Sequence, residues 1–174
     1  MTDVMWAHPD GSRTLLAPSA GIADFVGSIY EFDSVEVVTF SLIGAAPNLV
    51  HVRAGELEVE LHGGGAKPIF GRRPRLLRRS TRWIELEDSL LRPLVGRFVI
   101  QGAEGVRGHG LSPKGVREWY AIDSYRPVVA GRASIGSRDL GPLGPVDPPV
   151  RVGFSEFPRE PAVECAPVLE FPST

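Results

Sequence analysis

The chain has 174 residues, of which 43% are hydrophobic and 23% are charged, and its net charge is −2. These values are typical of a globular protein with one core, and they exclude wholesale disorder. Glycine and proline contribute 20 and 16 residues, which predicts many turns. The single cysteine, Cys165, excludes an intrachain disulfide and a thiolate metal cluster within one chain.

The start of the chain and its hydropathy predict neither a secretion signal nor a membrane span. Residues 1–10 carry Asp3 and no apolar run. No stretch approaches the roughly 18 apolar residues of a membrane-spanning helix. We therefore expect a cytoplasmic protein that makes no membrane contact.

Charge is distributed unevenly along the chain. Residues 1–71 carry a net charge of −6, residues 72–138 carry +8 and residues 139–174 carry −4. Such asymmetry is typical of a patch for an anionic partner. The alternative, which we prefer for most of the arginines, is that the three segments interleave in a sheet and their charges pair.

Most of the chain has the pattern of short β-strands, each rich in β-branched or aromatic residues and bounded by glycine, proline or aspartate. Outside the clearest hairpin, we expect strands at residues 13–17, 35–43, 82–87, 97–101, 116–125, 128–135, 150–157 and 162–171. Pro167 places the last of these at an edge or a bulge. Short strands at regular spacing are typical of an antiparallel barrel or sandwich.

Residues 49–62 predict a hairpin, because apolar and polar side chains alternate on both sides of its turn. A two-residue turn at Ala54-Gly55 sets Val52 opposite Leu57, so that both strands present one apolar and one polar face. A longer loop is the alternative, since alanine is not favoured at the first position of such a turn.

Two short helices are also expected. Ser19 is a candidate N-cap for a helix that runs to Tyr30 with apolar residues at helical spacing. A second helix is expected from a cap at Asp88 to Val95, with its length limited by Pro93. The sequence shows no alternation of strands and helices, which argues against a doubly wound sheet.

The predicted fold is therefore a single mainly β domain over residues 1–174: an antiparallel β-barrel with one or two short helices, with a β-sandwich as the alternative. A barrel is favoured because closure removes the exposed edges of many short strands. The proline-rich residues 141–149 are expected to form a connection strapped across the barrel, and residues 170–174 a loose tail.

The sequence contains no P-loop, no nucleophile elbow and no His-Glu-x-x-His zinc motif. His51 and His62 on the outer face of the hairpin make only a weak metal proposal, and a solvated face is preferred. Six arginines between residues 72 and 82, beside Trp83, have the density that contacts nucleic acid, but a pI near 6.1 argues against that partner. We therefore predict no cofactor, no metal site and no nucleic-acid partner.

The segment Gly102–Tyr120 is the chemically densest part of the chain, with five glycines among its first fourteen residues. Long loops of this kind in compact proteins often serve as lids or binding loops. In the strand that follows, Glu118 shares a face with apolar neighbours. If that face is buried, this carboxylate needs a cationic partner or a bound proton.

This segment supplies the candidate site residues. We expect a cavity at the barrel mouth that binds a small amphipathic, acidic molecule through cationic and aromatic side chains. The predicted ligand-binding residues are Arg107, Lys114, Arg117, Trp119 and Tyr120. One alternative is an enzyme in the same cavity, with Glu118 and His109 as acid and base. Another is a protein–protein interaction or assembly module, a homo-oligomer included. A hairpin loop over a structural ion pair is the interpretation without a site.

Overall fold

A computed structural model of the chain describes residues 2–67, 77, 79–94, 105–151, 153–165 and 168–172. The elements of the first half are β1 (Val4–Ala7), β2 (Arg13–Ala17), α1 (Ala20–Gly27), β3 (Ser34–Val37), β4 (Phe40–Ala46), β5 (Leu49–Ala54) and β6 (Leu57–Gly63). The later elements are α2 (Thr81–Leu94), β7 (His109–Leu111), β8 (Val116–Tyr120), β9 (Ser124–Ile135), β10 (Arg138–Asp139), β11 (Ala162–Cys165) and β12 (Val168–Pro172).

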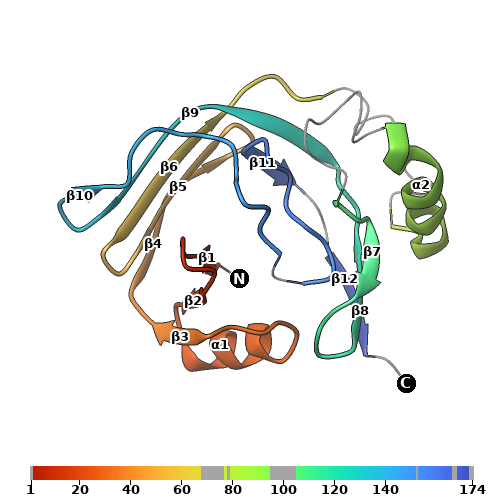
Figure 1. Ribbon diagram of the computed structural model, residues 1–174, viewed down its shortest axis with the longest axis horizontal. Coiled ribbons are helices and arrows are strands. Elements are labelled where there is room, and N and C mark those ends of the chain that lie inside the picture. The colour runs from red at the N-terminus through yellow and green to blue at the C-terminus, as the bar shows by residue number, and fades with distance from the viewer. Residues whose placement is uncertain are drawn as a thin grey trace.

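The strands form three sheets arranged around an open ring (Figure 1). The largest has the order β10-β9-β6-β5-β4, with β11 paired to β9, and it curves over the upper left of the view. The sheet β12-β8-β7 lies on the right with α2 outside it, and β1-β2-β3 lies below with α1. The fold is thus mainly β with antiparallel sheets, and none of the sheets formed by the described residues closes into a barrel.

The sheet β1-β2-β3 departs from the antiparallel prediction, because β2 and β3 are parallel and α1 connects them. The predicted cap is confirmed: the Ser19 hydroxyl accepts a hydrogen bond from the Ile22 backbone N–H. The helix ends at Gly27, earlier than expected. Strand β2 is buried on both faces, with Leu15 packed against α1 and Leu16 packed against the largest sheet.

The hairpin β5–β6 confirms the predicted faces but not the predicted register. Val52 lies opposite Val59, and Ala54 rather than Val52 lies opposite Leu57. The turn is displaced by one residue because Gly55 takes a positive φ of 58°, a conformation that glycine adopts without strain. Apolar side chains still share one face and polar side chains the other, since the shift is by two residues.

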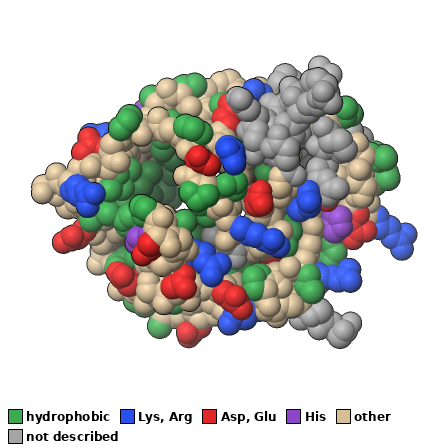
Figure 2. Space-filling model, in the orientation of Figure 1, with side chains coloured by type: hydrophobic (Ala, Val, Ile, Leu, Met, Phe, Trp, Pro, Cys, Tyr) green, Lys and Arg blue, Asp and Glu red, His purple; other side chains and the backbone are tan. Residues whose placement is uncertain are grey.

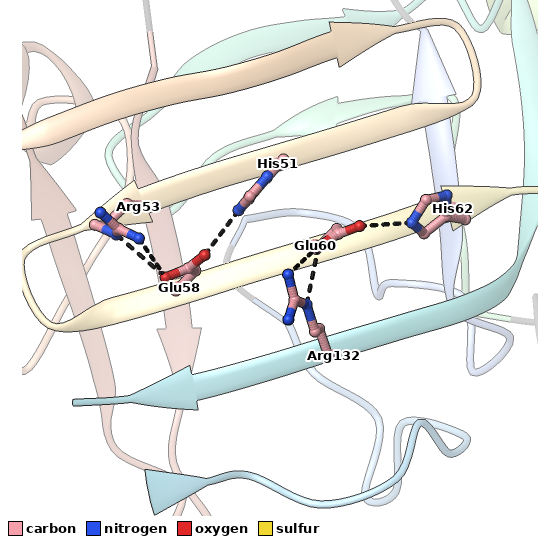
Figure 3. A network of polar contacts seen from close by, with 6 residues as sticks. All are labelled: His51, Arg53, Glu58, Glu60, His62 and Arg132. Atoms are coloured by element: carbon pink, nitrogen blue, oxygen red, sulfur yellow. Dashed lines mark hydrogen bonds and ion pairs between the residues drawn. The ribbon is translucent and has the colours of Figure 1, made fainter. Parts of the chain in front are cut away.

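The outer face of β5, β6 and β9 carries a row of ion pairs (Figure 3). Glu58 accepts hydrogen bonds from Arg53, at 2.6 Å from its Nη2, and pairs with His51 at 2.9 Å. Glu60 joins Arg132 on β9 to His62 on its own strand, at 2.7 and 2.8 Å. The two histidines proposed weakly as metal ligands each contact a glutamate in this row.

Helix α2 overturns the strand predicted at residues 82–87, which forms the first half of a helix that continues through the predicted residues 88–94. The Ser80 hydroxyl accepts from the Trp83 backbone N–H at the start of the helix. Residues Ile84 to Glu87 alternate apolar and polar side chains as a strand does, but Ile84 and Asp88 recur at helical spacing and face the same hairpin. Four residues of alternation cannot separate the two periods.

Other predicted strands are divided or replaced. Residues 35–43 and 116–125 are each interrupted at a corner, and residues 162–171 form β11 and β12. The described residues of the predicted strand 150–157 form no strand, and Arg151 and Glu156 make one isolated bridge. The tail expected to be loose from residue 170 is wrong for residues 170–172, which belong to β12 and pair with β8. The strand predicted at residues 97–101 lies outside the described residues.

Candidate functional site

A pocket of about 230 Å³ opens between β2, the β7–β8 turn and residues 151–153. It is lined by Arg13, Leu111, Pro113, Arg151 and Gly153. Two cationic side chains from distant parts of the chain therefore meet two apolar side chains at one opening. Such a mixture binds a molecule that has an anionic group and a small apolar body.

The two arginines are held in different ways. The Arg13 Nε lies 3.6 Å from Asp33 Oδ2, and the same carboxylate oxygen accepts the Arg13 backbone N–H at 2.7 Å. The Arg151 Nε donates to the carbonyl oxygen of Gly153 at 3.0 Å. Among the described residues, no carboxylate lies within 4.0 Å of the Arg151 guanidinium. Asp33 thus balances the charge of Arg13, and no described carboxylate balances the charge of Arg151.

Gly153 joins the pocket to a buried polar cluster. A Cβ at this position would lie 2.8 Å from the Tyr30 ring, so only glycine lets the backbone approach so closely. Behind it, the Tyr30 hydroxyl donates to Glu118, whose side chain is fully buried. The Tyr30 and Tyr120 hydroxyl oxygens are 3.2 Å apart. Burial, followed by the hydrogen bonds to Glu118 and Tyr120, raises the pKa of Tyr30 well above its ordinary value.

An aromatic contact closes this cluster. The rings of Tyr120 and Phe154 stack with centroids 5.1 Å apart. Phe154 fills the space that a side chain at position 110 would need, because a Cβ on Gly110 would lie 2.4 Å from its ring. One glycine of the predicted binding loop therefore has a packing role.

The other face of the β7–β8 hairpin packs against α2. Trp119 is buried with Ile84, and its Nε1 donates to Glu85 at 3.0 Å. The His109 Nδ1 lies 3.4 Å from Asp88, whose other oxygen accepts the Gly108 backbone N–H at 2.9 Å. His109 lies directly opposite Trp119 in the register, and Glu118 opposite Gly110. His109 and Glu118 therefore project from opposite faces, and the structure does not bring them into one site.

The predicted ligand-binding residues do not line the pocket, although their loop does. Lys114 and Arg117 are exposed, and the Arg107 backbone N–H donates to the Ser155 hydroxyl at 2.8 Å. The Tyr120 hydroxyl lies beside that of Tyr30, behind the pocket, and Trp119 lies under α2. Leu111 and Pro113, from the same segment of the chain, line the pocket instead.

The sequence singled out neither of the two pocket arginines. Arg13 is the first residue of a predicted strand and Arg151 the second residue of another, and no motif surrounds either one. They are two among 19 basic residues spread along the chain. Only the folding of residues 151–153 beside β2 and the β7–β8 turn distinguishes them from the other arginines.

Comparison with known proteins adds no relative: no protein-family model, no curated protein and no solved structure matches the chain. In the described part of the chain, no helix has the length and apolar character needed to cross a membrane. The same residues contain no group of three histidine, cysteine or acidic side chains arranged to hold a metal ion. Most of the arginine-rich segment at residues 72–82 lies outside the described residues.

Proposed function

We propose that this protein binds a small amphipathic acid in the pocket between β2 and the β7–β8 turn. The observation that carries the proposal is the convergence of Arg13 and Arg151 at a pocket with two apolar wall residues. A volume of about 230 Å³ is small for a ligand site, which favours a molecule of the size of an aromatic monocarboxylate.

Charge balance supports a singly charged anion. Two arginines that line one pocket repel each other through their charges, and Asp33 offsets only that of Arg13. A carboxylate between the arginines would offset the second charge and accept charge-assisted hydrogen bonds, the stronger class of hydrogen bond in proteins. Leu111 and Pro113 would cover the apolar part of the ligand.

The enzyme alternative keeps one supporting observation. Glu118 lies beneath the pocket floor, 3.7 Å from the position of a Cβ on Gly153. His109, its proposed partner, is on the other face of the hairpin, so acid–base chemistry here would depend on Glu118 and Tyr30. The closed barrel, the cytoplasmic location and the assembly module stay predictions from the sequence.

Calorimetric titration with benzoate, benzylamine and benzyl alcohol tests the binding proposal. We expect benzoate to bind and the other two, of similar size and shape, to bind far more weakly. The Arg151→Gln variant should weaken benzoate binding about tenfold to a hundredfold, as expected for loss of a charge-assisted hydrogen bond. Arg138→Gln, at an exposed arginine on β10, is the matched control and should change nothing.

The Asp33→Asn variant should change the affinity for benzoate in the opposite direction, which makes it the sharper test. The amide oxygen can still accept the Arg13 backbone N–H, but the charge that competes with the ligand is gone. Benzoate should therefore bind more tightly to this variant. Equal binding of benzylamine, or equal loss in the Arg151→Gln and Arg138→Gln variants, would show the proposal to be wrong.

A further inference from the structure

We infer that the protein has a second binding site, for a slender alkyl chain with a hydroxyl head group, in the hollow between the largest sheet and β1–β2. Figure 2 shows this hollow on the left of the molecule, where hydrophobic side chains gather. Its walls belong to the inner faces of β4, β5, β6 and β9, and to the face of β1-β2-β3 turned toward them. No residue of the arginine pocket belongs to these walls.

The large sheet supplies an uncharged wall. The strand register places apolar side chains or glycine at every inward position of β5, β6 and β9 that is paired in this region. These residues are Val50, Val52, Ala54, Leu57, Val59, Leu61, Gly131, Ala133 and Ile135. A charged or strongly polar ligand body would lose its hydration here without gaining a partner, so the wall selects a hydrocarbon.

The hollow is closed at one end and accessible at the other. Leu57 and Ala54 are buried against Leu16, which closes the base. Val59 and Leu61, further along the same wall, stay only half-buried. A filled barrel interior would bury all inward-facing side chains equally, because protein interiors are close-packed. The gradient of burial along one face therefore marks space that side chains leave open.

The opposite wall carries a short row of hydrogen-bonding groups. His8 Nε2 and Thr14 Oγ1 are 2.8 Å apart, and Thr14 Oγ1 and Ser34 Oγ are 2.7 Å apart. The register places Trp6 and Ser34 on either side of Thr14, so all three project toward the large sheet with Leu16. The Trp6 and His8 rings stack at 4.9 Å. A neutral hydroxyl head can both donate to this row and accept from it.

A slender occupant fits better than a protein surface, because Leu143, in the proline-rich residues 141–149, lies close to the wall of the hollow at Gly131. A Cβ on Gly131 would lie 2.9 Å from Leu61 Cδ2 and 3.4 Å from Leu143 Cδ1. Leu143 and Leu61 therefore both lie close to this glycine. The hollow is bounded by the large sheet, Leu143 and β1–β2, and this geometry suits a chain rather than a helix or a second globule.

A series of linear 1-alkanols from hexanol to dodecanol tests the inference, measured by displacement of the neutral fluorophore N-phenyl-1-naphthylamine. We expect affinity to rise about fourfold for each added CH₂ and to level off once the hollow is full. Saturating benzoate should not displace the fluorophore, which separates this site from the arginine pocket. The dependence of affinity on alkanol chain length can be measured even if benzoate does not bind, so the two proposals can fail independently.

Two variants locate the site. Leu61→Trp fills the hollow and should weaken decanol binding about tenfold or more. Val50→Phe, on the strand beside it, is the milder alternative if Leu61→Trp does not fold. Val35→Trp is the control, because Val35 is half-exposed on the face of β3 that points away from the hollow.

Three outcomes would overturn the inference. One is an affinity that does not depend on chain length. The second is an equal loss of binding in Val35→Trp and in the filling variants. The third is a dimer in native mass spectrometry that Leu61→Trp dissociates and that binds no fluorophore, since a second copy would then occupy the hollow.

Discussion

Tyr30 and Tyr125 are buried in different parts of the fold and have the same electrostatic consequence. Burial is the largest cause in both, and it raises the pKa of each phenol well above 10. Glu118 adds to the effect at Tyr30, and Glu160 and Glu164 add to it at Tyr125. Each tyrosine therefore keeps its proton in the folded protein at a pH where the unfolded chain has lost it.

A pH titration followed by absorbance at the tyrosinate band should show directly that the pKa values of these tyrosines are raised. The chain has three tyrosines, and at about pH 11 we expect no more than one to ionise while the protein is folded. In denaturant all three should ionise near pH 10. Because the folded state binds more protons than the unfolded state above pH 10, the free energy of unfolding falls as pH rises beyond that value. Three tyrosines titrating together near pH 10 in the native protein would contradict the burial of this cluster.

The sequence predicted that Glu118 shares a face with apolar neighbours, but it left open whether that face is buried and what contacts the carboxylate. Alternation in residues 116–122 placed it on an apolar face, and the carboxylate is fully buried there. The contact that the structure shows is with Tyr30, from α1's C-terminal side and far away in the chain. Periodicity reports which face a residue occupies, and only tertiary packing decides what faces it.

In the hairpin β5–β6 and the neighbouring strand β9, the strand register places opposite charges next to one another. Hydrogen bonds from Arg53 and then His51 hold the pKa of Glu58 below its ordinary value of 4.5. Hydrogen bonds from His62 and then Arg132 do the same for Glu60. The contacts are exposed and screened by salt, so their effect is one of pH dependence more than of total stability.

Acid should weaken this sheet first. A carboxylate whose folded pKa is depressed contributes stability above its unfolded pKa and loses it as pH falls through the folded value. We expect the urea concentration at the unfolding midpoint to decrease as the pH is lowered from about 5 to about 3. The decrease should be smaller in the Glu58→Gln, Glu60→Gln double variant. Glu31→Gln, at an exposed site outside the row, is the control. An identical acid response in the double variant and the native protein would remove the row as its cause.

Helix α2 shows how an element can be assigned correctly in part and wrongly in part. Its C-terminal half was predicted as a helix from its leucines, while its N-terminal half alternates like a strand. The choice is made by Ile84 and Asp88, which contact the β7–β8 hairpin at helical spacing. Tertiary contacts of this kind override short local patterns.

For the whole molecule, β2 is the strand that connects two cores. Leu15 packs with α1 on one face, and Leu16 packs with Ala54 and Leu57 of the largest sheet on the other. Residues from the first 20 positions therefore hold the base of the hollow. None of the sheets formed by the described residues closes into a barrel, so the closed barrel that the sequence favoured stays a prediction.

Truncation of Leu16 tests that role. Leu16→Ala should cost about 2–5 kcal/mol, because the cavity would lie between the two sheets. Leu86→Ala is the matched control: Leu86 is 47% exposed on α2, and its loss should cost less than about 0.5 kcal/mol. Urea unfolding monitored by tryptophan fluorescence measures both. Similar values for the two variants would mean that β2 does not couple the sheets.

The sequence alone determined the mainly β class, the cap at Ser19, the two faces of the β5–β6 hairpin and the apolar neighbours that share a strand face with Glu118. These follow from period, composition and local hydrogen bonding, which act within a few residues. It did not determine the hairpin register, the course of residues 82–87 or the pairing of residues 170–172. It also did not determine that Arg13 meets Arg151. Those outcomes depend on which distant segments pack together, and contacts between distant segments leave no local pattern in the chain.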